Sequence, residues 1–376
     1  MKNTTKYVGL DVSKEEIAVA IANEGREKPR YYGMIPNTPE AIRKLVNKLG
    51  DIEYLKVCYE AGPTGYGIYR FLMSLGVECE VIAPSLIPKK PGDRVKTDRR
   101  DALQLASLYR AGELTTVYVP SEEDEILRDL VRAREDVKED LLRAKHRLTK
   151  LLLRRNINPP PSVKRKWTTR YREWLNSLTF ESSTLNLVFQ EYYHQVTELE
   201  QRKQRLEKQI QYEAEKGFHA PIIQALQVLR GISVLTATGL AAEVASFLRF
   251  GKAGQFMAFG GLVPSEESSG PLRKQGGITK TGNKHIRWLL IESAWSYRYK
   301  PAVRGELKKR QEGQPASITA ISWKAQQRLH QKYQRLISKG KPPGKAITAV
   351  ARELAGFVWA IAKEIELERE KEKQAV

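Results

Sequence analysis

Apolar residues alternate with small or polar ones over the first part of the chain. Val8, Leu10 and Val12 alternate with Gly9 and Asp11, a period of two that is typical of a strand. Similar patterns and helix start and stop signals predict two strands around a polar turn in 6–23, strands over 30–35, 54–60 and 79–84, and helices over 39–49, 65–76 and 97–112. Three strands followed by alternating helices and strands is the order of an α/β RNase H-like fold.

The hydrophobic period changes after Ser121, where apolar residues return every three or four positions. Spacing near 3.5 with charged flanks is typical of long helices, and predicts an antiparallel coiled-coil hairpin. Arg134 and Lys203 interrupt its two apolar runs, which consist of Leu127, Leu130, Val137, Leu141, Ala144, Leu148 and Leu151, and of Tyr192, Val196, Leu199, Leu206 and Ile210. Such an arm is either purely structural, or it serves assembly or spans DNA.

These patterns divide the chain into three predicted domains. Residues 1–120 form the α/β domain, 121–217 the coiled-coil arm, and 218–376 a mainly α-helical C-terminal domain. Within the last domain, the segment 259–290 is rich in Gly and Ser, and we expect a loop that leads into a helix.

The charge of the chain narrows the class of partner. Lys and Arg number 64 against 44 Asp and Glu, a net charge of +20, which suits a polyanion and most often a nucleic acid. An anionic membrane surface is the rival, but the positive charge is spread along the whole chain. The longest apolar run, Ala355 to Ala362, is too short to span a bilayer.

The cysteine and histidine content excludes two kinds of site. Cys58 and Cys79 are the only cysteines, so a disulfide framework and a Cys-rich zinc site are excluded, and the five histidines follow no ligand spacing. The first residues lack the apolar core of a signal peptide. We therefore expect a cytoplasmic protein.

Four acidic residues are candidates for a metal site. In the expected fold, Asp11 lies on the first strand, Glu60 ends the fourth, and Asp98 and Asp101 lie in the first turns of the helix over 97–112. Residues three apart share a helix face, and adjacent strands bring Asp11 and Glu60 together. Phosphodiester cleavage by two Mg²⁺ ions roughly 4 Å apart needs such a set of carboxylates.

A second explanation exists for the acids of the helix. Acidic residues in a first turn suit the helix dipole, and Thr97 is a good N-cap, which suffices for Asp98 taken alone. Asp11 in mid-strand is costly if it is buried without a function. Taken together, the four acids favour the metal site.

Two basic segments are candidates for nucleic-acid binding. Between the arm helices, cations alternate with aromatic residues that are able to stack on bases. A helix tip with a solvated charged face is the alternative. The cations near the acids are expected to hold phosphate. The candidates are Lys164, Arg165, Lys166, Trp167 and Arg170 at the tip, and Lys96, Arg99 and Arg100 beside the acids.

The Gly- and Ser-rich segment contains a candidate nucleophile. Ser268 and Ser269 precede Gly270, and a serine hydroxyl in a basic loop is able to attack a phosphodiester and form a phosphoserine ester. Ser-Ser-Gly is also ordinary turn chemistry. His285 is the only candidate base nearby, and activation by a metal is equally plausible. The cations that would stabilise the developing phosphorane charge are Arg273, Lys274, Lys280, Lys284 and Arg287.

The chain resembles the DEDD-type insertion-sequence transposases nearly from end to end. The segments that carry the resemblance are "GLDVSKEEIAVAI", "YEAGPTGYGIYRFL", "APSLIPKKPGDRVKTDRRDALQLASLYRAGELT", "FGGLVPSEESSG", "GGITKTGNKHIRWLLIESAW" and "GKPPGKAITAVARELAGFVWAIA". This family consists of bridge-RNA-guided recombinases that pair a RuvC-like domain with a serine-bearing C-terminal transposase domain.

The resemblance implies a site and a set of partners. It implies a RuvC-like fold whose four acids bind Mg²⁺, matched here by Asp11, Glu60, Asp98 and Asp101, and a serine that becomes joined to DNA, matched by Ser268 with Ser269 as its neighbour. It implies a structured noncoding guide RNA that pairs with target and donor double-stranded DNA. It also implies homodimers that pair into a tetramer, with acids and serine from different subunits.

One departure and two rival functions accompany this hypothesis. Many relatives continue the serine with Gly-Gly-Lys, whereas this chain has Gly270-Pro271-Leu272, and Pro271 is expected to stiffen the loop. The enzyme alternative is a Holliday-junction-type, metal-dependent nuclease that uses water as its nucleophile. The other alternative is a nucleic-acid-binding protein that cleaves nothing.

Overall fold

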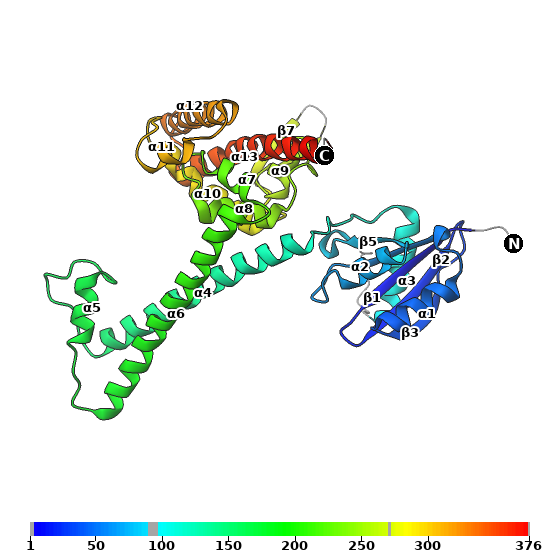
Figure 1. Ribbon diagram of the computed structural model, residues 1–376, viewed down its shortest axis with the longest axis horizontal. Coiled ribbons are helices and arrows are strands. Elements are labelled where there is room, and N and C mark those ends of the chain that lie inside the picture. Colours follow the sequence, from blue (N-terminus) through cyan, green and yellow to red (C-terminus); the bar gives the residue numbers. More distant parts are fainter. Residues whose placement is uncertain (1–3, 89–96, 270–271, 375–376) are drawn as a thin grey trace. The chain divides into compact units, whose positions relative to one another are not determined.

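The computed structural model describes residues 4–88, 97–269 and 272–374. The chain forms two compact units, Met1–Val119 and Pro120–Val376 (Figure 1). The first unit contains β1 (Lys6–Val12), β2 (Glu16–Asn23), β3 (Arg30–Pro36), α1 (Pro39–Leu49), β4 (Leu55–Glu60), α2 (Gly67–Ser74), β5 (Glu78–Ile82) and α3 (Asp98–Ala111).

The second unit is mostly helical. It contains α4 (Glu122–Arg154), α5 (Thr169–Asn176), α6 (Ser183–Lys216), α7 (Ala220–Leu226), α8 (Val234–Val244), α9 (Ala253–Phe259), β6 (Pro264–Ser269), β7 (Leu272–Ile278), α10 (Lys284–Ala294), α11 (Glu306–Gln311), α12 (Ala316–Ser338) and α13 (Pro343–Gln374). No helix in the described ranges is long and apolar enough to cross a membrane.

The five strands of the first unit form one mixed sheet in the order β3-β2-β1-β4-β5. β1, β2 and β3 pair antiparallel, whereas β4 runs parallel to β1 and β5 runs parallel to β4. The predicted elements of this unit are present, with ends that differ by one or two residues. The arrangement is compatible with the RNase H-like fold.

The two faces of the sheet bury residues of very different size. On β2, Ile17, Val19 and Ile21 point toward the face that α1 and α2 cover, where they join a large aliphatic core. The residues between them are alanines, and they pack against alanines of α3 on the other face. Because the side chains between α3 and the sheet are this small, the helix lies unusually close to the strands.

Gly9 of β1 marks the closest approach of α3 to the sheet. A Cβ atom on Gly9 would lie 2.5 Å from the backbone nitrogen of Ala106 and 2.6 Å from the carbonyl oxygen of Ala102. No real Cβ atom tolerates such distances to backbone atoms. Glycine at this position is therefore required for the contact between α3 and β1.

The two long helices of the second unit, α4 and α6, pack against each other along the arm, as the hydrophobic period predicts (Figure 1). The charged residue that interrupts the apolar run of α4 faces a partner on α6. Arg134 is almost fully buried, and its Nε and Nη2 atoms donate to Oε1 of Glu207 at 3.0 Å and 2.6 Å. Lys203, which interrupts the other run, also contacts Glu207. The interruptions thus meet in one ion-pair cluster.

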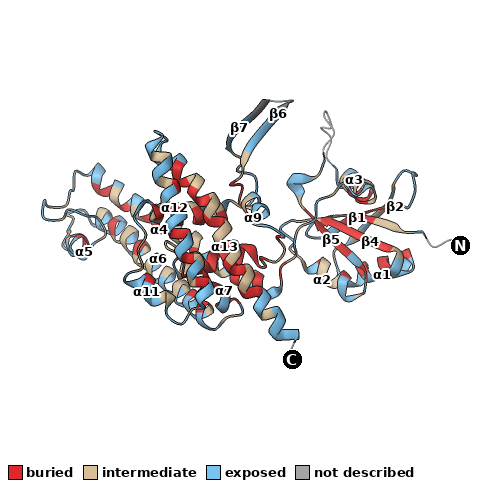
Figure 2. Cartoon of the chain, turned by 90° about the horizontal axis from the view of Figure 1, so that it is seen from above, coloured by how far each residue is buried: buried red, intermediate tan, exposed pale blue. Residues whose placement is uncertain are grey.

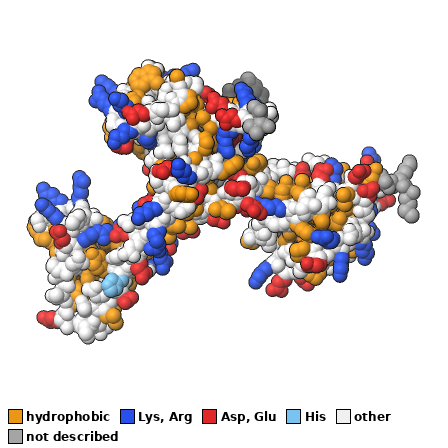
Figure 3. All heavy atoms as spheres, in the orientation of Figure 1, with side chains coloured by type: hydrophobic (Ala, Val, Ile, Leu, Met, Phe, Trp, Pro, Cys, Tyr) orange, Lys and Arg blue, Asp and Glu red, His pale blue; other side chains and the backbone are white. Residues whose placement is uncertain are grey.

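The segment between the arm helices folds into a tip around α5 with its own small core. Tyr171 is buried, while Trp167 and Trp174 are half-buried and lie against it at ring-centroid distances of 5.4 Å and 5.2 Å. Lys145 of α4 lies over the ring of Trp167. The predicted cations of the tip, Lys164, Arg165, Lys166 and Arg170, are exposed, and Figure 3 shows Lys and Arg side chains around this lobe.

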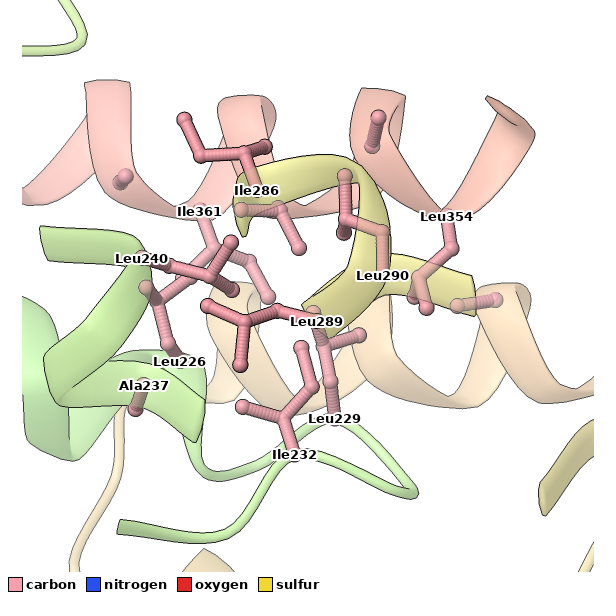
Figure 4. Close-up of a cluster of buried hydrophobic side chains, with 14 of the residues drawn as sticks. Leu226, Leu229, Ile232, Ala237, Leu240, Ile286, Leu289, Leu290, Leu354 and Ile361 are labelled. Atoms are coloured by element: carbon pink, nitrogen blue, oxygen red, sulfur yellow. The ribbon is translucent and has the colours of Figure 1, made fainter. Parts of the chain in front are cut away.

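A larger core holds the rest of the second unit together. Leucines and isoleucines of α8, α10 and α13 and of the segment after α7 interdigitate there (Figure 4). Figure 2 shows buried residues along the inner sides of these helices. Together they form a packed helical base from which the β6–β7 hairpin extends (Figure 2).

The segments 264–269 and 272–278, for which the sequence predicts a loop, form instead the antiparallel strands β6 and β7. Ser268 pairs with Arg273 and Glu267 with Lys274 in the register of β6 and β7. The Gly and Ser residues favour turns, but a strand that is exposed on both faces also consists mainly of polar residues, as β6 does. The described strand residues place successive side chains on opposite faces of the ribbon.

Replacing Gly9 with alanine tests the close packing of α3. We expect the Gly9→Ala variant to lose about 1–3 kcal/mol of unfolding free energy. The new methyl group meets backbone atoms of α3, which cannot turn away as a flexible side chain can. Urea unfolding at neutral pH measures the loss. Gly67→Ala is the matched control, because a Cβ atom there meets nothing within 4 Å. Equal stability of the two variants would contradict the required contact.

Candidate active site

Asp11 and Glu60 lie side by side at the ends of two neighbouring parallel strands. The register pairs Gly9 of β1 with Cys58 of β4, and each acid lies two residues further along its strand. Because side chains alternate along a strand, both acids share the face of the sheet that α3 covers. Both side chains are half-buried.

The direction of α3 brings its N-terminus to the same end of the sheet. Tyr109, near the end of the helix, packs edge-to-face on Tyr7 at 5.6 Å, whereas Ala102 contacts Gly9. The helix therefore runs opposite to β1, and its first turn lies toward Asp11.

Asp98 and Asp101 lie in that first turn. Thr97 is the N-cap, as predicted, and its hydroxyl accepts a hydrogen bond from the backbone nitrogen of Arg100 at 3.4 Å. Asp98 is exposed and Asp101 is half-buried next to Ala102, which is fully buried against the sheet. Three separate segments thus bring acidic residues to one end of one face.

The side chains do not form a compact ligand group. In the described ranges, no three Asp, Glu, His or Cys side chains lie close enough together to hold one metal ion. The backbone brings the four acids to the same end of the sheet, but the carboxylates are not gathered around a common point. The donor set consists of carboxylate oxygens alone, which are the ligands that Mg²⁺ prefers, and the set fits such an ion in chemistry.

The cations predicted beside these acids have different surroundings. Lys96 lies outside the described residues. The guanidinium of Arg99 lies 5.2 Å from the centre of the Tyr31 ring, a cation–π contact with the neighbouring strand β3. The side chain of Arg100 is exposed and also has an interaction partner.

Ser268 lies on the exposed β6–β7 hairpin, in the second unit. Its hydroxyl donates a hydrogen bond to Oε1 of Glu266 at 2.9 Å. The other oxygen of Glu266 accepts a hydrogen bond from Nε2 of Gln275 at 3.4 Å, across the hairpin. A serine, a carboxylate and an amide thus form a chain of hydrogen bonds on one face of the ribbon.

The cations predicted around the serine fall into two groups. Lys274, Lys280 and Lys284 are exposed. Arg287 is half-buried and donates to the carbonyl oxygen of Gly260 at 3.0 Å, so it holds the base of the hairpin. For Arg273 the structure describes the backbone position opposite Ser268.

His285, the predicted candidate base, belongs to a different cluster. Its Nδ1 lies 3.4 Å from Oε1 of Glu243, and its Nε2 is buried without a hydrogen-bond partner. Neither ring nitrogen is hydrogen-bonded to Ser268, so His285 is not the only candidate base: Glu266 contacts the serine hydroxyl directly.

Glu243 is the centre of that second cluster. Arg132 of α4 contacts it through two nitrogens at 3.0 Å and 3.2 Å, and Nδ2 of Asn283 donates to it at 2.7 Å. Burial by itself would raise the pKa of Glu243, but hydrogen bonds from His285, Arg132 and Asn283 outweigh it and hold the pKa well below its usual range. The carboxylate is therefore charged, and it joins α4, α8 and α10.

An open pocket of about 840 Å³ adjoins this cluster. Arg132, Glu135, Lys138 and Trp288 line it together with His285. The ammonium of Lys138 lies 4.2 Å from the centre of the Trp288 ring. Cations and carboxylates alternate around the opening, so the pocket has no single sign of charge.

Sequence reasoning missed several residues of these clusters, and Glu266 and Glu243 are the two acids among them. Glu266 precedes Ser268 by two positions, a spacing that matters only once the segment is known to be a strand. Glu243 is the only charged residue in the otherwise apolar helix α8. A lone acid in an apolar helix is a usable signal of a buried ion pair, and it would have pointed to Glu243.

Replacing Glu243 with glutamine tests the buried cluster. We expect Glu243→Gln to lower the unfolding free energy by about 2–3 kcal/mol at neutral pH, because three donors lose a charged acceptor. A carboxylate whose pKa is lowered by folding stabilises the folded state at pH values above the ordinary glutamate pKa, near 4.3. This contribution to stability is lost progressively as the pH falls below that value. The difference from wild type should therefore shrink in acid.

Chemical denaturation at several pH values measures this difference. Glu139→Gln is the control on the same arm. Glu139 forms an exposed ion pair with Arg143, and such a surface pair contributes less than about 1 kcal/mol to the free energy of unfolding. A difference between wild type and Glu243→Gln that stayed constant down to pH 3 would contradict the charged cluster.

Comparison with known proteins places both units in one family. Residues 8–157 match the family model DEDD_Tnp_IS110, described as "Transposase", and residues 223–307 match the model described as "Transposase IS116/IS110/IS902 family". The chain is 44% identical over 363 residues to "Putative transposase y4qE" of Sinorhizobium fredii, which covers 95% of this chain and 88% of the relative.

Two further relatives extend the comparison. "Transposase for insertion sequence element IS1533" of Leptospira borgpetersenii is 36% identical over 89% of this chain and 97% of its own length. "Pilin gene-inverting protein" of Moraxella lacunata is 24% identical over 73% of this chain and 69% of its own length. With such identities over almost its whole length, the chain belongs to the IS116/IS110/IS902 family of insertion-sequence transposases.

Proposed function

We propose that the protein cleaves and exchanges DNA strands of its insertion sequence through a phosphoserine intermediate, guided by a structured noncoding RNA. The observation that carries the proposal is the side chain of Ser268, which is exposed and hydrogen-bonded to a carboxylate on a ribbon that extends from a packed helical base. An accessible serine with a bonded acceptor is the arrangement that nucleophilic catalysis requires.

The serine chemistry conserves the energy of the broken DNA bond. Oγ of Ser268 attacks phosphorus, and the P–O bond to the leaving strand breaks, so a covalent protein–DNA ester takes its place. A second strand then attacks this ester and releases the serine. Lys274 and Lys280, both exposed, supply positive charge for the crowded phosphorus centre.

The four acids are assigned to divalent metal. Asp11, Glu60, Asp98 and Asp101 come from three segments that meet at one end of the sheet face under α3, which supports their acting together. When bound there, Mg²⁺ would supply charge neutralisation to the phosphodiester. The residues themselves would turn their carboxylates toward a common point, and the first turn of α3 adds the polarity of a helix N-terminus.

The partners proposed are target and donor double-stranded DNA and the guide RNA. The net charge of +20 and the exposed cations of the α5 tip support binding of phosphate backbones. One relative bears the name of a gene-inverting protein, which agrees with strand exchange. A homodimer that pairs into a tetramer would bring the acids of one subunit to the serine of another.

A covalent-adduct assay tests the nucleophile. Purified protein, its RNA, Mg²⁺ and labelled DNA should give a DNA-linked band on a denaturing protein gel, and Ser268→Ala should abolish it. Ser265→Ala, on the same strand, is the control and should keep the band. DNA that is cut without any adduct would favour the hydrolytic nuclease, and an adduct that is lost only in Ser269→Ala would move the nucleophile by one residue.

Calorimetric titration with Mg²⁺ tests the metal site without reference to activity. Wild type should bind the ion, and Asp11→Asn and Glu60→Gln should each weaken binding by about 10-fold or more, because each removes one charged ligand from a small set. Glu53→Gln is the control, since this exposed acid lies at the opposite end of β4. Unchanged binding in both site variants would remove the metal assignment.

A further inference from the structure

We propose that Glu266 is the general base that takes the proton from Ser268 during attack on DNA, and that Gln275 holds this base in position. The inference rests on the proposed serine chemistry and deepens it. It replaces His285, which the sequence suggested, with a carboxylate on the same strand as the nucleophile.

The strand geometry explains why Glu266 reaches Ser268. The two residues are two apart on β6, so their side chains leave the same face of the ribbon. The distance of 2.9 Å from Oγ of Ser268 to Oε1 of Glu266 is that of a good O–H···O bond. Glu267 lies between them and points to the other face, where its register partner is Lys274.

Gln275 completes the arrangement from the opposite strand. It is the register partner of Glu266, and its Nε2 donates to Oε2 at 3.4 Å, the oxygen that does not contact the serine. A base that is itself oriented by a third group is the general signature of an activated nucleophile. Because Gln275 donates to the base and not to the reacting serine, it is a positioning residue.

The other candidate bases are engaged elsewhere. His285 faces Glu243 with one nitrogen, and its other nitrogen is buried. Glu243 accepts from Arg132 and Asn283. Glu266 is the acid on the hairpin that accepts the hydrogen of the Ser268 hydroxyl.

The proton-transfer step balances without any further reactant. As the Oγ–P bond forms, the hydroxyl proton moves from Oγ of Ser268 to Oε1 of Glu266. The electron pair of the breaking P–O bond goes to the leaving oxygen, which takes a proton from solvent. When a DNA hydroxyl later attacks the phosphoserine, its own proton is released to solvent as the new P–O bond forms, and the protonated Glu266 returns its proton to the departing Oγ.

The test measures the rate of adduct formation as a function of pH in the full protein with its RNA, Mg²⁺ and DNA. Glu266→Gln keeps the shape of the side chain but cannot accept the proton, and we expect its rate to fall about 100-fold or more. Glu267→Gln is the matched control, one residue away with the same change of charge, and should stay within about 3-fold of wild type.

The pH dependence separates a base from a merely structural residue. The wild-type rate should fall in acid as the carboxylate of Glu266 takes up a proton, and Glu266→Gln should lack this limb of the profile. Gln275→Ala should shift the limb and lower the rate less than Glu266→Gln does. Glu266→Asp should recover part of the rate, and thermal unfolding should show that the variants are folded.

The possible failures are distinguishable. If wild type forms an adduct that Ser268→Ala abolishes, while Glu266→Gln reacts like wild type at every pH, the base assignment is overturned and the serine mechanism survives. If wild type cuts DNA with no adduct at all, the proposed function and this inference both fall. If Glu266→Gln and Glu267→Gln lose activity equally, the loss comes from the changed charge of the hairpin, and Glu266 is again excluded as the general base.

Discussion

The close contact between α3 and the sheet is the constraint on which the first unit depends. A helix this near the strands demands glycine at residue 9 and alanines on both surfaces, and these small residues leave no slack for the helix to slide or rotate. Because α3 begins at Asp98, after its N-cap Thr97, and its last turn packs on Tyr7 through Tyr109, the same contact decides where the acidic first turn lies. The packing of apolar atoms thus determines the position of charged ones.

In the second unit, the small exposed β6–β7 hairpin depends on contacts with the helices around its base. A two-stranded hairpin alone is barely stable in water. Here it is anchored by Arg287, which reaches back to the carbonyl of Gly260, and by a large aliphatic core below. The chain of hydrogen bonds from Ser268 through Glu266 to Gln275 then adds order on one face of the ribbon. Position, rather than burial, makes this serine distinctive.

Most of the secondary structure was predictable from the sequence, and the hydrogen-bond partners of Ser268 and His285 were not. The alternation around Val8 and Leu10 predicts the sheet, and the three-and-four spacing predicts the two long helices, because both signals are local. The segment around Ser268 was expected to be a loop, since Gly and Ser favour turns, and so the partnership with Glu266 stayed hidden. The contact of His285, a candidate base, with Glu243 is not visible in a local pattern because the two residues lie 42 positions apart in the chain.

The buried carboxylate of Glu243 has a mechanical consequence. Arg132 belongs to the arm helix α4, and Asn283 is the N-cap of α10, directly after the hairpin. One charged group therefore connects the arm helix α4 to the N-terminus of α10, the helix that follows the β6–β7 hairpin. Any displacement of α4 relative to α10 has to break these hydrogen bonds or carry both helices together, because Arg132 and Asn283 donate to the same carboxylate.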